Sequence, residues 1–101
     1  MNLAERAPVF CFRLFVAGDA ANSAQAIANL AALCRVHLPS RHEIEIVDVF
    51  REPARALAEG VFLTPTLVRL TPRPIRKIVG TLSQTDVVLM SLGLGIDTVA
   101  A

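Results

Sequence analysis

The chain has 101 residues, enough for one domain with a single hydrophobic core and too few for two. Hydrophobic residues make up 53% of it, charged residues 19%, and the formal net charge is +1, which excludes a disordered chain and a strongly basic nucleic-acid-binding protein. No apolar run approaches the ~20 residues that span a membrane, and no signal peptide is recognisable, so we expect a cytoplasmic protein.

The first predicted elements are a strand and a helix. Residues 9–18 are almost continuously apolar and end at Gly18, which is typical of a buried strand. Asn22, followed three residues later by Gln25, resembles a helix capping signature. Apolar residues then recur at helical spacing and predict an amphipathic helix ending before Pro39: Ala24, Ile27, Ala28, Ala31, Cys34 and Leu38.

A second strand and a short helix come next. The apolar alternation of residues 43–50 shifts phase at Val47, which favours a strand covered on both faces. The preceding helix separates it from the first strand, so the two strands are expected to be parallel. Pro53 at a first helical position and Gly60 just past the end predict the short helix.

The C-terminal part predicts two strands and a last helix. Residues 61–70 and 75–80 read as antiparallel strands joined by a tight turn. Signals for the start of the last helix are a capping box, Ser83 with Asp86, and a hydrophobic staple, Leu82 with Val87. The helix passes Met90 and is expected to fray at Gly93 and Gly95.

The resulting order is β-α-β-α-β-β-α, an α/β, thioredoxin-like arrangement with a mixed four-stranded sheet. We expect a domain at residues 9–95, with flexible arms at 1–8 and 96–101. In such folds the proline before the third strand is often cis, and Pro65 occupies that place.

The redox thiols of a thioredoxin would lie at the start of the first helix, where the helix dipole lowers a thiol pKa. This chain has "GDAANSAQ" there, without a cysteine. Cys11 and Cys34 are 23 positions apart, which is neither a redox pair nor a metal-ligand spacing, and we expect buried, inert thiols.

Three blocks of the sequence carry a family resemblance: "LFVAGDAANSAQAIANLAAL", "IEIVDVFREP" and "FLTPTLVRLTPRPIRKIVGTLSQTDVVLMSLGL". In this order they resemble the KaiB family of small circadian-clock proteins and the related sensor domain of a partner histidine kinase. The resemblance covers Phe10 to about Leu94.

The resemblance implies a non-catalytic module that binds the ATP-hydrolysing ring of KaiC in a thioredoxin-like state. It also implies an alternative fold, β-α-β-β-α-α-β, that assembles into tetramers. The expected partner-binding residues are Arg69, Arg73, Arg76, Lys77 and Asn22. The expected structural or fold-switching residues are Gly18, Asp48, Pro65, Gly80, Ser91 and Gly93.

Several positions depart from the family pattern. Gln25 and Glu45 stand where clock members usually carry basic residues, and the acidic C-terminal tail of many members is absent. Ser91 replaces a common glycine and favours a continuing helix by up to ~1 kcal/mol, while Gly93 replaces a common aspartate and opposes it by a similar amount. We expect a divergent member that rests in the thioredoxin-like fold.

Alternatives remain open at this point. The basic residues could form a solvated face that protects an edge strand from aggregation. Nucleic-acid binding is disfavoured because no aromatic ladder accompanies them. The function classes are a KaiC-binding module that competes with a kinase sensor domain, a KaiB-like stress or signalling protein with another partner or only a homo-oligomer (dimer or tetramer), and a single-thiol redox protein. No cofactor, metal or membrane partner is expected.

Overall fold

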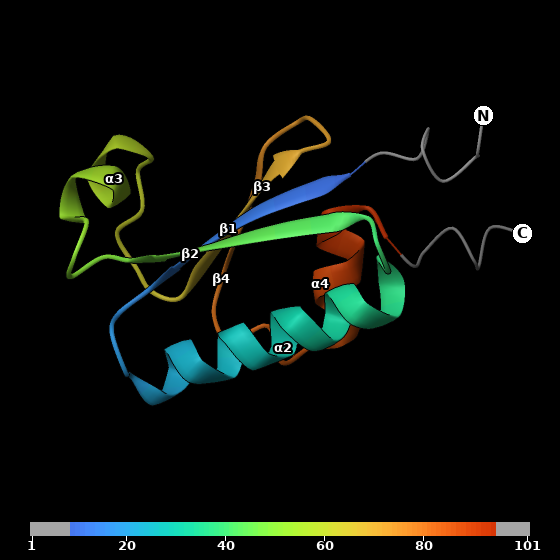
Figure 1. Ribbon diagram of the computed structural model, residues 1–101, viewed down its shortest axis with the longest axis horizontal. Helices are drawn as coiled ribbons and strands as arrows, with labels where there is room; N and C mark the ends of the chain where they lie inside the picture. The colour runs from blue at the N-terminus through green and yellow to red at the C-terminus, as the bar shows by residue number, and fades with distance from the viewer. Residues whose placement is uncertain (1–8, 95–101) are drawn as a thin grey trace, which may run out of the picture.

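A computed structural model describes residues 9–94 of the chain (Figure 1). The elements follow in the order β1 (Phe10–Val16), α2 (Ala21–His37), β2 (His42–Asp48), α3 (Pro53–Ala58), β3 (Thr66–Thr71), β4 (Arg76–Val79) and α4 (Thr85–Leu92). They form a 4-stranded sheet in the order β2-β1-β3-β4, in which β1 is parallel to β2 and the other pairs are antiparallel.

This order confirms the thioredoxin-like prediction and its mixed sheet. The alternative order is not adopted, because residues 66–71 and 76–79 are consecutive antiparallel strands followed by a single helix. The Thr64–Pro65 bond is cis, as predicted, and the bonds before Pro72 and Pro74 are cis as well. The arms expected at 1–8 and 96–101, and the fraying at Gly95, lie outside the described residues.

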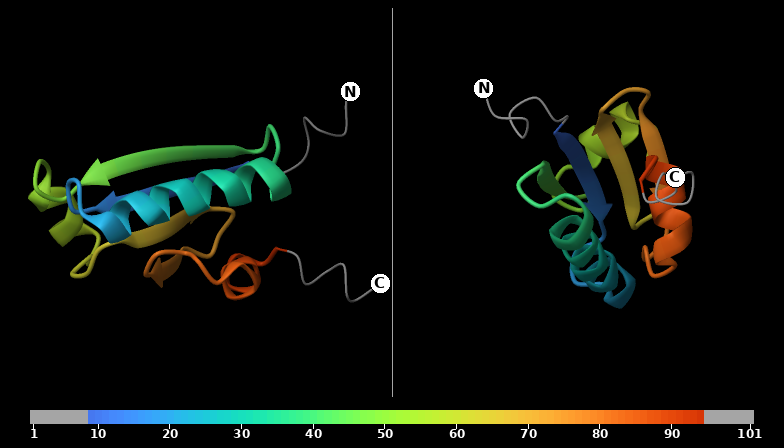
Figure 2. Two further views of the ribbon diagram at one scale, coloured as in Figure 1. Left: turned by 90° about the horizontal axis from the view of Figure 1, so that it is seen from below. Right: turned by 90° about the vertical axis from the view of Figure 1, so that its right-hand side faces the viewer.

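The sheet has a core on each face. Alternate β1 residues, Phe12 and Leu14 among them, pack with Leu30 of α2 and Leu92 of α4. On the other face Phe15 and its strand neighbours pack beneath the short helix α3. Figure 2 accordingly shows α2 and α4 along one face of the sheet and α3 near one end of the other.

The prediction that β2 is covered on both faces is wrong. This strand is an edge of the sheet, paired only with β1, and Val47 is its one fully buried residue. The phase shift at Val47 reflects the place where α3 covers one end of the strand.

The predicted start and apolar face of α2 are also wrong. The N-cap is Ala20, without a side-chain hydrogen bond, and Asn22 is exposed inside the first turn. The Ser23 hydroxyl instead accepts a hydrogen bond from the Ala17 N–H (3.0 Å). The predicted face contributes only Cys34 and Leu38 to the core; the buried residues within the helix are Ser23, Ala26, Leu30, Leu33 and Cys34. Burying two leucines removes more apolar surface from water than burying the alanines of the predicted face.

The start of α4 differs from its prediction in the same way. Its N-cap is Gln84, again without a side-chain hydrogen bond, and the Ser83 hydroxyl accepts one from Thr81 (3.1 Å) instead of capping the helix. Leu82 is buried whereas Val87 is 54% exposed, and both line an open hollow. The helix ends at Gly93, whose φ of 77° is the left-handed conformation that glycine adopts most readily.

Candidate partner-binding edge

The structure divides the predicted basic cluster, because Arg69 is buried whereas the other members are exposed. Arg69 lies on β3, an interior strand, and is 5% exposed. Its guanidinium points to the face beneath α4, where Nη1 donates to the Leu92 carbonyl (2.6 Å) and Nη2 to the Pro74 carbonyl (2.7 Å). The Arg69 side chain is therefore held by its own chain in this fold, and its partner-binding role stays a prediction that this burial disfavours.

The environment of Arg69 explains what it does instead. The Leu92 carbonyl lies at the C-terminus of α4, the negative end of the helix dipole, so a buried cation there satisfies a carbonyl that the helix leaves free. Burial lowers the pKa of Arg69, and the nearby charge of Arg76 lowers it further. Its Nε is buried without a hydrogen-bond partner.

Lys77 has a related internal contact on the opposite face of the sheet. Its side chain is exposed, but Nζ donates to the backbone carbonyl of Glu59, the residue that caps the C-terminus of α3. Lys77 thus ties the edge strand β4 to α3, although its backbone still lies on the free edge of the sheet.

Arg73 and Arg76 remain. Both are exposed, and neither forms an ion pair or a side-chain hydrogen bond within residues 9–94. Arg73 lies in the turn between β3 and β4, and Arg76 begins β4 opposite Arg69. We call Arg73, Arg76 and the outer side of β4 the basic edge.

Asn22 does not join this group. It is exposed on the first turn of α2, which Figure 1 shows well apart from the turn between β3 and β4. Its partner-binding role stays a separate prediction.

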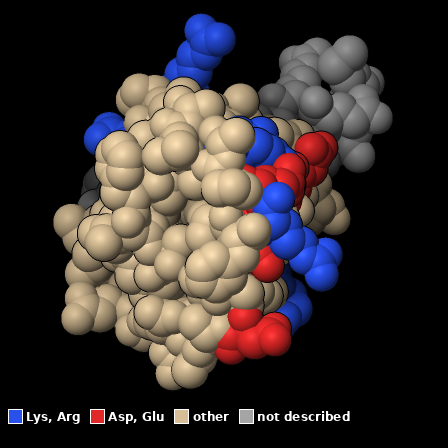
Figure 3. Space-filling model, turned by 90° about the vertical axis from the view of Figure 1, so that its left-hand side faces the viewer, with Lys and Arg blue, Asp and Glu red and all other residues tan. Residues whose placement is uncertain are grey.

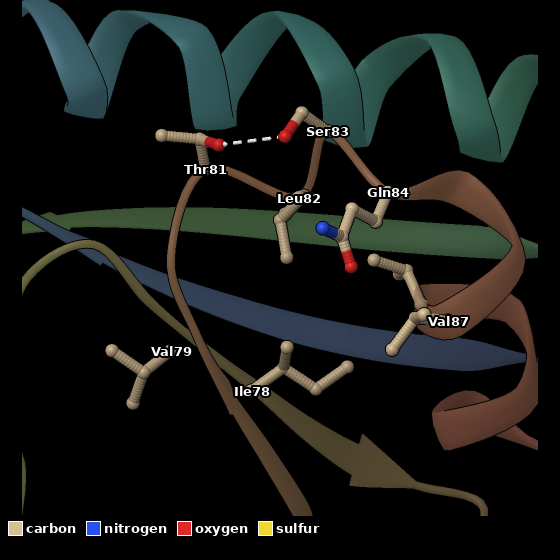
Figure 4. A pocket seen from close by; sticks show the side chains of 8 residues that line it. Ile78, Val79, Thr81, Leu82, Ser83, Gln84 and Val87 are labelled. Carbon is tan, nitrogen blue, oxygen red and sulfur yellow. Dashed lines mark hydrogen bonds between the residues drawn. The ribbon is translucent and has the colours of Figure 1, made fainter.

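A hollow of about 310 Å³ lies beside the basic edge, between β4 and the start of α4. In Figure 4, Ile78 lines its strand side, and Leu82, Gln84 and Val87 line the side of α4 and the preceding loop. The Ile78 side chain packs partly against the main core, whereas Val79 and Val87 are 58% and 54% exposed. The basic edge therefore has apolar contact area next to its charges.

Two of the residues that we predicted to have a structural role, Gly18 and Asp48, stabilise loops of this fold. Gly18 adopts a φ of 52°, and its N–H donates to Asp48 Oδ1 (3.2 Å). The same oxygen accepts the Phe50 N–H (2.9 Å), so Asp48 joins the ends of β1 and β2. A side chain at Gly18 would place its Cβ 3.2 Å from the Phe50 ring.

The remaining predicted structural residues lie near β4 and α4. The Gly80 N–H donates to the carbonyl of Pro65 (2.9 Å), which extends the pairing of β3 and β4. The Ser91 hydroxyl donates to the Val87 carbonyl (2.8 Å) within the last turn of α4, two residues before Gly93 ends the helix. These contacts explain the residues in the observed fold, and a role in fold switching stays a prediction.

An ion network that the sequence analysis did not identify lies on the α3 face of the sheet. Arg13 donates to Glu45 (2.7 Å) and to Glu59 (2.6 Å), and Arg55 contacts both oxygens of Glu45 (2.8 and 2.9 Å) and Glu52 (3.4 Å). The network links β1, β2 and α3. The sequence did hold a signal for this network. Arg13 is the single charged residue of an apolar strand, Glu45 lies on the next strand, and the two are direct register partners.

The two arginines determine the electrostatics of Glu45. Hydrogen bonds from Arg55 and then Arg13 lower the pKa of the Glu45 carboxyl to about 2. The hydrogen bond to Glu45 is the largest cause that raises the pKa of Arg13 and of Arg55. Glu45 therefore stays ionised, and its carboxylate is paired with two arginines of its own chain.

The thiols give no support to redox chemistry. Cys34 is buried in α2, and burial raises the pKa of its thiol to about 11. Cys11 lies within β1, half-buried, with its Sγ 4.0 Å from a Glu43 oxygen. Neither thiol is placed at a helix N-terminus, where a thiolate would be stabilised.

A second exposed surface lies at the α3 end of the molecule. Figure 3 shows this end, where uncharged side chains cover most of the view and most of the charged ones lie along one side. Large apolar residues of the α3 region and its loops are 64–80% exposed: Phe50, Leu57, Phe62 and Leu63. This surface offers apolar contact area. Separately, no helix within residues 9–94 is long and apolar enough to cross a membrane.

Structural comparison places the fold among thioredoxin-like domains. The N-terminal domain of SasA from Synechococcus elongatus superimposes with a TM-score of 0.67 at 16% identity, covering 80% of this chain and 77% of that one. Chloroplastic thioredoxin z gives a TM-score of 0.70 at 14% identity, covering 89% and 81%. At these identities the likeness concerns the fold alone.

Sequence comparison is more specific. Residues 13–94 match the KaiB domain family. Circadian clock protein KaiB3 from a Synechocystis strain is 39% identical over 82 residues, which are 81% of this chain and 80% of that protein. Circadian clock oscillator protein KaiB from a Synechococcus strain is 33% identical over 85 residues, 84% of this chain and 83% of that protein. The chain therefore belongs to the KaiB family.

Proposed function

We propose that the chain is a non-catalytic interaction module that binds a KaiC-type ATPase and so modulates a clock-like timing or signalling system in the cytoplasm. The observation that carries the proposal is the family match over residues 13–94, with relatives named as circadian clock proteins. The placement of both thiols away from a helix N-terminus supports a binding role rather than a redox one.

The basic edge is the proposed contact surface for this ATPase. Arg73 and Arg76 are exposed and have no carboxylate partner within residues 9–94, so their charges are available for a partner. Charge-assisted contacts of this kind select an acidic surface and accelerate association. A kinase whose sensor domain shares the fold would compete for the same ATPase.

Co-purification with the KaiC-type ATPase of the same organism tests the proposal. We expect the chain to be retained by the ATPase in at least one nucleotide state, with ATP, with ADP or without nucleotide. A KaiB that binds the same ATPase is the positive control. Failure to bind in every state, while the control binds, would contradict the proposed function.

A second candidate is a KaiB-like stress or signalling protein with another partner or only with copies of itself, without a clock role. Glu45 favours it, because this position carries a carboxylate held by Arg13 and Arg55 instead of the basic residue usual in clock members. Isolation of a partner other than a KaiC-type ATPase, or of a stable homo-oligomer alone, would support this candidate.

A further inference from the structure

We infer that the outer side of β4 is a strand-addition site for an extended, acidic segment of a partner protein. In the segment that fits, an acidic residue lies two positions from an apolar one. The inference concerns how the basic edge binds and does not require that the partner be an ATPase.

The backbone of β4 has hydrogen-bonding groups to offer. β4 is the last strand of the sheet, so among residues 9–94 one of its sides has no neighbouring strand. The Gly80 N–H bonds to Pro65, and bonded and non-bonded pairs alternate in an antiparallel ladder. Ile78 and Arg76 therefore also bond to β3, whereas Lys77 and Val79 turn their N–H and C=O groups to the free side.

The side chains of β4 specify what such a segment must carry. Arg76 and Ile78 lie on the face of the sheet that α4 covers, because they are register partners of Arg69 and Leu67. An acidic residue of the segment opposite Arg76 would neutralise its positive charge. Ile78 borders the hollow of about 310 Å³, which an apolar side chain two positions along the segment would fill (Figure 4).

Charge argues against a second copy of this chain as the occupant. A β4 strand from another copy would bring a second Arg76 and a second Lys77 to the same short edge without any acidic β4 residue to neutralise them, and like charges gathered at one interface repel. An acidic segment instead neutralises Arg73 and Arg76, which have no counter-charge within residues 9–94.

A peptide titration of the isolated chain, followed by backbone amide NMR, tests the inference. The probe is the peptide Ser-Val-Val-Thr-Glu-Glu-Thr-Ser, and the control replaces both glutamates by lysines. We expect saturable shifts over residues 76–80 and at Val87, with affinity at least about tenfold higher for the glutamate peptide. Absence of saturable shifts, equal binding of both peptides, or shifts confined to another surface would overturn the inference.

Two variants separate backbone pairing from side-chain contact. Val79→Pro removes one outward N–H, at an edge position where proline is tolerated, and should weaken peptide binding about tenfold. Val79→Ala keeps that N–H and should weaken binding less. Amide spectra that retain the native shifts of β1 establish folding of each variant. Equal binding by both variants would contradict strand addition.

Self-association provides the remaining check. Sedimentation of the wild-type chain and of Val79→Pro should give the same oligomeric state if a partner segment occupies the β4 edge. An oligomer that Val79→Pro dissociates would show that a second copy occupies the site. Because neither experiment contains an ATPase, failure of this inference and failure of the proposed function are distinguishable.

Discussion

The α3 face of the sheet and the basic edge use arginine in opposite ways. On the α3 face, Arg13 and Arg55 share Glu45 and hold β1, β2 and α3 together. At the basic edge, Arg73 and Arg76 have no such partner within residues 9–94. The comparison teaches that the available carboxylates, rather than the number of cations, decide which positive charges can serve a partner.

Arg69 belongs to neither group, and its substitution should have the largest effect. Arg69→Ala removes both donors to the Leu92 and Pro74 carbonyls and leaves a cavity beneath α4. We expect the free energy of unfolding to fall by about 3 kcal/mol, measured by urea denaturation.

Arg69→Met separates the two contributions, because methionine restores much of the volume without the donors. We expect it to lose about half as much stability as Arg69→Ala. Stability of Arg69→Ala within about 0.5 kcal/mol of wild type would show that Arg69 is not the structural residue described above.

The paired and unpaired arginines should differ measurably in stability. Arg13→Ala removes contacts to both Glu45 and Glu59 and should cost about 1 kcal/mol, since the Arg13 side chain is only 23% exposed. Arg73→Ala, the matched control, should change stability by less than about 0.3 kcal/mol. Urea denaturation of both variants measures the difference. Equal decreases in the free energy of unfolding would contradict the distinction between paired and unpaired arginines.

The pH dependence of stability gives a smaller test of the paired group. The folded-state pKa of Glu45 is about 2, against an ordinary value of 4.5. Its contribution is therefore complete above about pH 4.5 and is lost as the pH falls toward 2. Because nearly half of this side chain is exposed, we expect at most about 1 kcal/mol.

Glu45→Gln should remove that part of the acid destabilisation. Denaturant midpoints at several pH values between about 4.5 and 2 measure it for both proteins. Identical slopes for the variant and the wild type would contradict the assignment of the low pKa to Glu45.

The order of helices and strands could be predicted from the sequence, because boundary residues such as glycine and proline and the spacing of apolar residues are both read from neighbouring positions. Gly18, Pro39 and Pro53 mark boundaries that the structure has within a few residues. The order of the strands across the sheet depends instead on contacts between residues far apart in the sequence. That is why β2 was expected to be covered on both faces, although it is an edge.

The errors within elements have a common physical origin. The helix α2 is rich in alanine, so two faces look similarly apolar, and only the packing of Leu30 and Leu33 selects one. The basic cluster was read as one surface because its residues are close in sequence. Both arginines lie on the same face as register partners, but β3 lies inside the sheet and β4 at its edge, so Arg69 is buried whereas Arg76 is exposed.

The measurement that tests the account most directly is the affinity of the KaiC-type ATPase for matched charge-reversal variants. Arg76→Glu should weaken binding by at least about tenfold, while Arg35→Glu, which changes the net charge equally at an exposed position of α2, should leave it within about twofold. Circular dichroism confirms that each variant is folded. Equal affinities for both variants would contradict the claim that the basic edge is the partner-binding surface.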